Sequence, residues 1–100
     1  MKMTPELYTK LALQFVEKGT TKETLYTGFA SECGEVMKER MKEVRKGEQK
    51  TVEIADELSD VLWYVAVIAH KLGYTLENFM EHSISKLEDR LLNPKGKNHD

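Results

Sequence analysis

The chain has 100 residues, of which 40% are hydrophobic and 32% charged, and its formal net charge is −2 with a pI near 5.9. This balance is typical of one small globular domain, excludes a disordered chain, and argues against a nucleic acid polymer as partner. The single cysteine, the lack of a signal-peptide pattern and the lack of an apolar run of about 20 residues lead us to expect a cytoplasmic protein that does not enter a membrane.

Two helices are predicted in the first half of the chain. Thr4-Pro5-Glu6 is a helix start, and Gly19 is expected to end that helix. Thr20-x-x-Glu23 has the pattern of a capping box for a second helix, which should run to about Lys46, with Gly47 just past its end. Two glycines, Gly28 and Gly34, interrupt this helix at a cost of about 1 kcal/mol each, which indicates close approach by a neighbour or a ligand.

The third predicted helix, 51–72, has two different faces. At roughly 100° per residue one face is apolar, with Leu58 and Leu62 among its residues. The opposite face starts with four carboxylates and continues with three large apolar side chains; these residues are Glu53, Asp56, Glu57, Asp60, Trp63, Tyr64 and Val67. Because so small a chain offers little cover for both faces, we expect a second subunit to cover Trp63, Tyr64 and Val67.

A fourth helix is predicted from the cap at Thr75 to about residue 92. Asn93-Pro94 ends it, and residues 93–100 are expected to form a flexible polar tail. The sequence therefore predicts a single domain over residues 1–92, with an all-α four-helix bundle assembled as an oligomer.

Two acidic pairs stand out as candidate metal ligands. Glu32 and Glu35 lie three residues apart on the second helix, as do Glu57 and Asp60 on the third, so each pair shares one helix face. Four carboxylates without histidine or cysteine are the ligand set that Mg²⁺ or Mn²⁺ prefers. Most such pairs lie simply on a solvated helix face. Here, however, the face that carries Glu57 and Asp60 becomes apolar and aromatic further along the helix.

The fourth helix carries a basic stripe of His82, Lys86 and Arg90. Basic side chains that face metal-holding carboxylates are typical of a polyphosphate site. The alternative is an ordinary solvent-facing helix surface. Trp63 is a candidate for stacking on a base, although an aromatic residue at core spacing is more often part of a core.

The strings SECGEV at 31–36 and ADELSDVLWY at 55–64, followed by Lys86 and Arg90, resemble the MazG-like nucleotide pyrophosphohydrolases of the all-α NTP pyrophosphatase superfamily. The resemblance covers about two thirds of the chain. It implies that Glu32, Glu35, Glu57 and Asp60 hold magnesium and that Lys86 and Arg90 contact substrate phosphates. Ser83 stands where the family usually has an asparagine, and the N-terminal helix matches poorly.

The resemblance further implies hydrolysis of a nucleoside triphosphate, expected to be a deoxynucleotide, to the monophosphate and pyrophosphate, for nucleotide-pool control or house-cleaning. Glu35 or Glu53 is expected to orient or deprotonate the attacking water, and the partners expected are the nucleotide and a second copy of the chain, in a homodimer or homotetramer. Two alternatives stay open at this point. One is an enzyme like phosphoribosyl-ATP pyrophosphohydrolase, and the other is a helical interaction module without catalysis.

Overall fold

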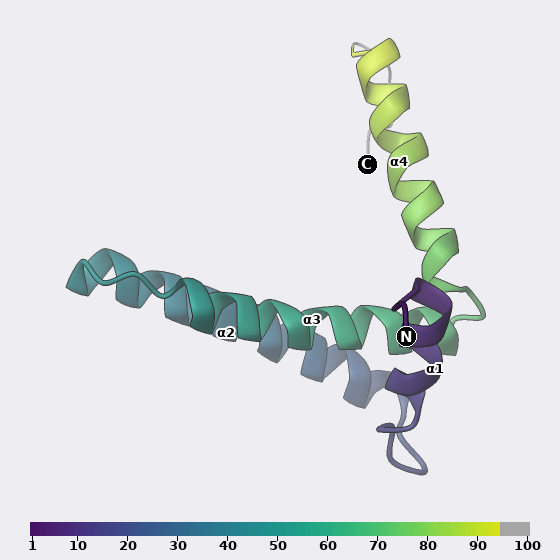
Figure 1. Cartoon of the computed structure of the whole chain (residues 1–100), viewed down its shortest axis with the longest axis horizontal. Helices are drawn as coiled ribbons and strands as arrows, with labels where there is room; N and C mark the ends of the chain where they lie inside the picture. The colour runs from purple at the N-terminus through teal and green to yellow at the C-terminus, as the bar shows by residue number, and fades with distance from the viewer. Residues whose placement is uncertain (95–100) are drawn as a thin grey trace.

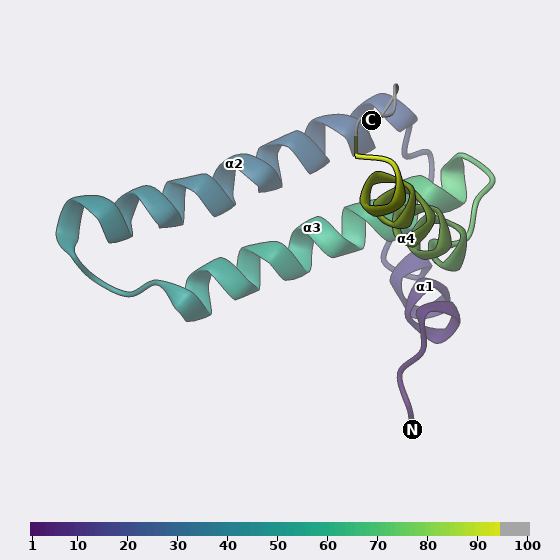
Figure 2. The ribbon, with the colours of Figure 1, turned by 90° about the horizontal axis from the view of Figure 1, so that it is seen from above.

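The computed structural model describes residues 1–94, which form four α-helices joined by short loops (Figure 1). They are α1 (Pro5–Leu13), α2 (Lys22–Lys46), α3 (Thr51–Lys71) and α4 (Leu76–Leu92). No strand occurs within these residues, so the all-α prediction is confirmed. The two longest helices, α2 and α3, form an antiparallel pair (Figure 2). The single-domain assignment stays a prediction, and most of the predicted tail at 93–100 lies outside the described residues.

Most of the helix ends follow the chemistry of the sequence. The Thr4 hydroxyl accepts a hydrogen bond from the amide of Leu7 at 3.1 Å, and Thr75 forms a reciprocal capping box with Asn78. Gly47 ends α2 with a φ of 68°, a left-handed conformation that favours glycine. The predicted cap at Thr20 is wrong by one residue. Thr21 caps α2, because the Thr20 hydroxyl is donated to the carbonyl of Glu17 at 2.6 Å.

The first helix is shorter than predicted. It ends at Leu13 and not near Gly19, and Phe15 is largely exposed. The carbonyl of Ala12 accepts the amide of Phe15 at 3.1 Å and the indole N–H of Trp63 at 3.1 Å. The backbone hydrogen bonds of α1 therefore change to the tighter i→i−3 type and end where α1 meets α3. Residues 14–21 form the connection to α2.

The packing of the two faces of α3 differs from the prediction. Trp63, Tyr64 and Val67 are covered by the chain's own helices, and Val67 has no exposed surface at all. The face predicted to be core is buried only in part, because Ala69 on it is fully buried whereas Leu58 and Leu62 remain about half exposed, at 51% and 46%. The aromatic face contacts α1 through the hydrogen bond from Trp63 to Ala12, and α2 through the packing of Tyr64 on Gly28.

One glycine makes that contact possible. A Cβ on Gly28 would overlap the ring and hydroxyl of Tyr64, so the predicted close approach is confirmed at this position. Within residues 1–94, no atom outside α2's own backbone lies within 4 Å of the corresponding point on Gly34, so no neighbour in the chain approaches there, and approach by a ligand stays a prediction.

The fourth helix leaves the other three at a steep angle (Figure 1). Its first residue, Leu76, is buried, but α4 contacts only α1 and α3 and makes no contact with α2. The Cα radius of gyration is 16.4 Å, against about 13 Å for a compact domain of this length. The predicted four-helix bundle therefore does not close within one chain, because only the start of α4 is packed.

The open arrangement leaves large apolar side chains uncovered on three helices. They include Met37, Met41 and Val44 on α2, Leu58 and Leu62 on α3, and Met80, Ile84, Leu87 and Leu91 on α4. Within residues 1–94, no helix is long and apolar enough to cross a membrane.

Candidate metal centre and its surroundings

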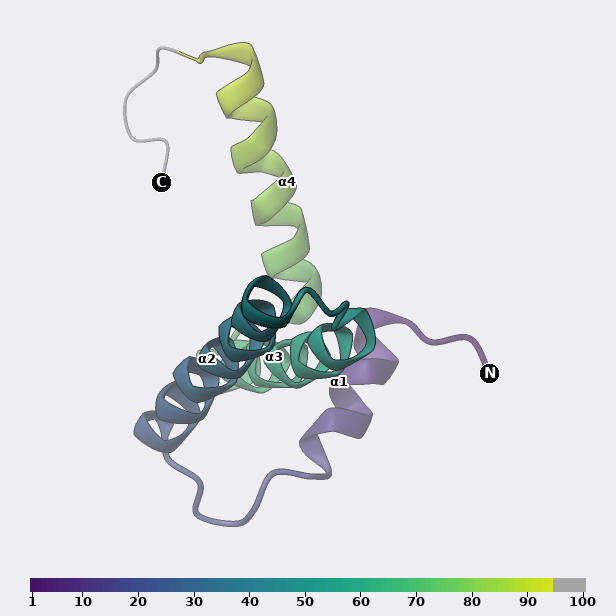
Figure 3. The same cartoon turned by 90° about the vertical axis from the view of Figure 1, so that its left-hand side faces the viewer.

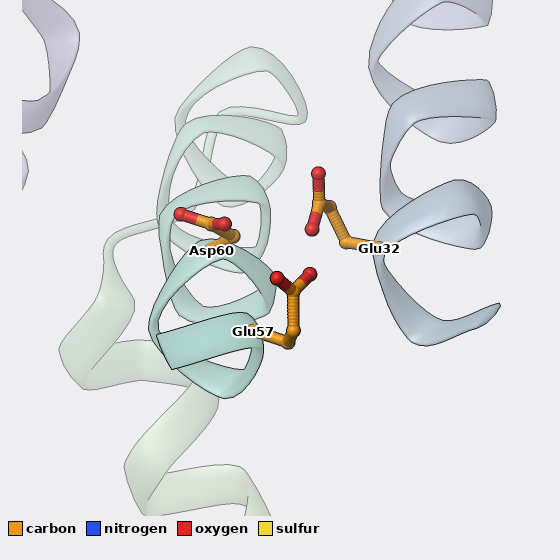
Figure 4. Close-up of side chains that lie close together, drawn as sticks. All are labelled: Glu32, Glu57 and Asp60. Carbon is orange, nitrogen blue, oxygen red and sulfur yellow. The ribbon is translucent and has the colours of Figure 1, made fainter. Parts of the chain in front are cut away.

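Three of the four predicted metal ligands converge between α2 and α3. Glu32 comes from α2, and Glu57 and Asp60 come from successive turns of α3. One carboxylate oxygen of each lies within 4.8 Å of the others, and the three groups face one another across the helix pair (Figure 4). Glu32 and Glu57 are half-buried and Asp60 is exposed, so the cluster opens to solvent on one side. We call these three residues the acidic cluster.

No basic side chain among residues 1–94 balances the charge of the acidic cluster. Oε2 of Glu32 is buried and has no hydrogen-bond partner among the described residues. Partial burial raises the pKa of the Glu57 carboxyl, and the neighbouring Glu32, Glu35 and Asp60 raise it further. No Lys or Arg lies within ion-pair distance of the acidic cluster in residues 1–94. Three carboxylates held this way favour a cation between them.

The fourth predicted ligand and the predicted water-activating residues lie around the acidic cluster. Glu35 is half-buried one turn beyond Glu32, and its charge reaches Glu57. Glu53, one turn before Glu57, is exposed, and its carboxylate lies 3.9 Å from Nζ of Lys50. Glu35 thus lies beside the acidic cluster without joining it, and Glu53 lies at its solvent side near a lysine.

The donor set fits a hard divalent cation. All the groups are carboxylate oxygens, which suit Mg²⁺ and Mn²⁺ and do not suit zinc or copper. The spacing between the groups is of the order that a shared ion spans, and the partnerless oxygen of Glu32 is a ready ligand. When bound here, the ion would remove the repulsion that raises the pKa of Glu57.

The predicted phosphate-binding residues are not brought to the acidic cluster within one chain. Lys86 and Arg90 lie in the second half of α4, which makes no contact with α2. They line an open groove of about 290 Å³ along α4, together with Phe79, His82, Ser83 and Leu87. In residues 1–94, no carboxylate lies within ion-pair distance of Lys86 or Arg90. The basic stripe is therefore formed, but away from the carboxylates.

A second cavity lies beside α3 near the aromatic residues Trp63 and Tyr64. It has a volume of about 220 Å³ and lies among the segment after α1, the start of α2, and α3. Its lining residues are Phe15, Val16, Glu17, Thr20, Thr24, Leu25, Trp63 and Tyr64. We call this space the Trp63 cavity; its lining residue Tyr64 is one helical turn along α3 from Asp60.

Trp63 itself is fixed in place. Its indole N–H donates to the carbonyl of Ala12, and its ring meets that of Tyr64 edge to face, with centroids 4.9 Å apart. A ring held by these two contacts has little freedom to change its orientation.

One neighbour of the site was not identified from the sequence. Partial burial raises the pKa of the Tyr8 hydroxyl, and the charge of Asp60 adds to the effect. Tyr8 of α1 therefore lies within electrostatic range of the acidic cluster. The sequence held no sign of this, because α1 lacks a motif and the two residues are far apart in the chain.

The fold and the cluster together define an all-helical domain with an oxygen-donor site suited to a divalent cation. The family model of the MazG nucleotide pyrophosphohydrolase domain matches residues 20–93, and the chain belongs to this family. Membership confirms the resemblance drawn from the two acidic motifs and indicates nucleotide pyrophosphohydrolase activity. No curated protein and no solved structure matches the chain. The matched segment begins after α1, so Tyr8 lies outside it.

Proposed function

We propose that the protein hydrolyses a nucleoside triphosphate, by preference a deoxynucleotide, to the monophosphate and pyrophosphate, with Mg²⁺ or Mn²⁺ as cofactor. The observation that carries the proposal is the convergence of Glu32, Glu57 and Asp60 within 4.8 Å, with no basic partner from residues 1–94. Membership of the MazG family supports it. We further propose a role in nucleotide-pool control or house-cleaning in the cytoplasm.

Each group of charged residues has its own role in the proposed reaction. Glu32, Glu57 and Asp60 would hold the metal, with Glu35 beside them as the proposed fourth ligand, and the bound ion would polarise the α-phosphate and lower the pKa of water. Glu35 or Glu53 orients the attacking water or accepts its proton. The basic side chains Lys86 and Arg90 donate hydrogen bonds to the phosphates and to the leaving pyrophosphate.

The Trp63 cavity is the proposed place for the base. It lies one turn from the acidic cluster, and the fixed ring of Trp63 lines it. A base held there has its phosphates directed toward the carboxylates. The exposed apolar faces support a homodimer or homotetramer, because monomers rarely leave so much apolar surface uncovered.

The test is an analysis of products from the common triphosphates and several modified ones. We expect nucleoside monophosphate and pyrophosphate in equal amounts, with Mg²⁺ or Mn²⁺ present. The proposal is wrong if the products are diphosphate and inorganic phosphate, or if turnover persists in excess EDTA.

A further inference from the structure

The Trp63 cavity lies on one side of the helix pair. Figure 3 shows the segment that joins α1 to α2 on one side of α2 and α3, whereas α4 rises from the other side. The described lining residues come from that segment, from the start of α2 and from α3, and none of them comes from α4. With about 220 Å³, the cavity is smaller than sites that hold a whole drug-sized ligand, so it suits a single ring system.

Most of the polar side chains that line the cavity already have hydrogen-bond partners. Trp63 donates its indole N–H to a backbone carbonyl of α1. Thr20 donates its hydroxyl to the carbonyl of Glu17 at 2.6 Å, and the hydroxyl of Thr24 shares a hydrogen bond of 3.0 Å with that of Thr21. These groups are therefore occupied within the chain, and the reading of a bound base falls to the remaining polar side chains.

Two polar lining residues, Glu17 and Tyr64, have side chains that make no hydrogen bond or ion pair with residues 1–94. The Tyr64 hydroxyl lies against Gly28 and, as a hydroxyl, can both donate and accept. A carboxylate only accepts, so Glu17 favours the edge of a base that consists of donors. Glu17 is thus the lining residue with the stronger preference between bases.

The backbone holds Glu17 in a fixed place at the cavity. Its carbonyl accepts both the hydroxyl and the amide of Thr20, at 2.6 and 3.2 Å. The carbonyl of Thr20 accepts Nζ of Lys71 at 3.1 Å, which ties this turn to the end of α3. Because the turn is anchored before a ligand arrives, little ordering cost is left for binding.

We propose that the Glu17 carboxylate selects guanine as the base of the substrate. Guanine presents two neighbouring donors on its Watson–Crick edge, N1–H and the N2 amino group, and the two oxygens of one carboxylate accept both. Thymine and uracil present one N–H between two carbonyl oxygens, which a carboxylate repels. Adenine and cytosine present an amino group beside an acceptor nitrogen. The inference rests on the proposed function, because it names the base of the triphosphate that this site hydrolyses.

The aromatic lining also favours a purine. Trp63 and Phe15 both line the cavity, and Phe15 is 76% exposed, so much of its ring is open to contact. Bases stack on aromatic side chains, and the two fused rings of a purine cover more of such a surface than a pyrimidine does. Stacking thus favours purines, and the carboxylate of Glu17 distinguishes guanine from adenine.

The base preference of wild type and of Glu17→Gln tests the assignment. We expect kcat/KM of wild type for dGTP to exceed that for dTTP at least ~10-fold, as for other bidentate base contacts. The analogue dITP keeps N1–H but lacks the N2 amino group, so its kcat/KM should fall between the two. In Glu17→Gln the advantage of dGTP over dITP should be lost, since a side-chain amide offers one acceptor oxygen and not two.

Glu23→Gln is the matched control. Glu23 is exposed at the start of α2 and does not line the cavity, so its replacement removes the same charge without touching the base. Its ratio of kcat/KM for dGTP to that for dTTP should equal the ratio of wild type. Equal kcat/KM for dGTP and dTTP in wild type, or equal ratios in Glu17→Gln and Glu23→Gln, overturns the assignment.

Binding without turnover gives a second readout. Trp63 is the single tryptophan of the chain, so quenching of its fluorescence reports a base in the cavity. With EDTA present, dGMP should quench wild type at lower concentration than dTMP does, and Glu17→Gln should not distinguish the two. Quenching of wild type at equal concentrations overturns the assignment. Failure of the proposed function looks different, because then no triphosphate releases pyrophosphate with Mg²⁺, whatever its base.

Discussion

Two carboxylates between the same pair of helices have opposite environments. At the far end of the pair, Glu43 accepts the backbone amide of Lys50 at 2.7 Å and the Arg40 guanidinium at 2.8 Å. The hydrogen bond from Lys50 and then that from Arg40 lower the pKa of Glu43. Near the middle, burial and neighbouring carboxylates raise the pKa of Glu57. Glu43 at the end of the helix pair has its hydrogen-bond partners, whereas Glu57 in the middle has no basic partner among residues 1–94.

The two environments distinguish a carboxylate that stabilises the fold, Glu43, from one suited to bind a ligand, Glu57. Glu43 ties the end of α2 to the start of α3, where Lys50 precedes the helix and gives it no side-chain cap. Its ionised form therefore stabilises the fold. Ionised Glu57 destabilises the fold beside Glu32 and Asp60, and a protein keeps such an arrangement where a ligand compensates for it.

The largest expected effect is on turnover. Asp60→Asn removes a proposed metal ligand and should lower kcat at least ~10²-fold, a loss of roughly 2.7 kcal/mol of transition-state stabilisation. Steady-state pyrophosphate release measures it. Asp56→Asn is the matched control, since Asp56 is exposed on the same helix and lies outside the acidic cluster. Equal losses in both variants would mean that activity depends on the overall negative charge of α3 and not on the acidic cluster.

The next effect concerns packing beside the cluster. Gly28→Ala places a methyl group against the Tyr64 ring, and we expect it to lower the free energy of unfolding by about 1–3 kcal/mol. Chemical denaturation measures the change. Gly34→Ala on the same helix meets no neighbour within 4 Å and should raise stability by up to about 1 kcal/mol. Similar changes in the two variants would contradict the close contact between Gly28 and Tyr64.

The smallest effect lies at the far end of the pair. Glu43→Gln should lower the melting temperature by a few degrees at pH 7. A lowered folded-state pKa stabilises the fold above the ordinary glutamate pKa, and this contribution is lost as the pH falls through the lowered value. The difference from wild type should therefore shrink in acid, as melting curves between pH 7 and pH 3 would show.

Glu48→Gln is the control for this variant. The Glu48 carboxylate lies 3.2 Å from Nζ of Lys50 but is exposed, so its loss should change little. A Glu43→Gln difference that stays constant with pH would mean that the carboxylate charge does not hold the two helices together.

The sequence predicted the local features well and the long-range ones poorly. Helix starts at Thr4 and Thr75 and the end at Gly47 depend on nearby residues, and they were confirmed. The convergence of Glu32 with Glu57 and Asp60 followed from two short spacings on adjacent antiparallel helices.

Which face of α3 is covered could not be read from the sequence, because both faces carry apolar residues in its second half. The outcome depends on Gly28 admitting Tyr64 and on Ala12 accepting the Trp63 indole, contacts between distant segments. The direction of α4 and the position of Tyr8 near Asp60 are likewise set by tertiary packing.

The central claim is that a bound divalent cation neutralises the negative charge of the acidic cluster. Its most direct test is a Mg²⁺ titration of the melting temperature at constant ionic strength, for wild type and Asp60→Asn. Binding to the folded state alone raises stability, so wild type should melt at higher temperature as Mg²⁺ increases, and Asp60→Asn should not respond. A wild-type melting temperature that is unchanged by Mg²⁺, or an equal rise in Asp60→Asn, would contradict the account.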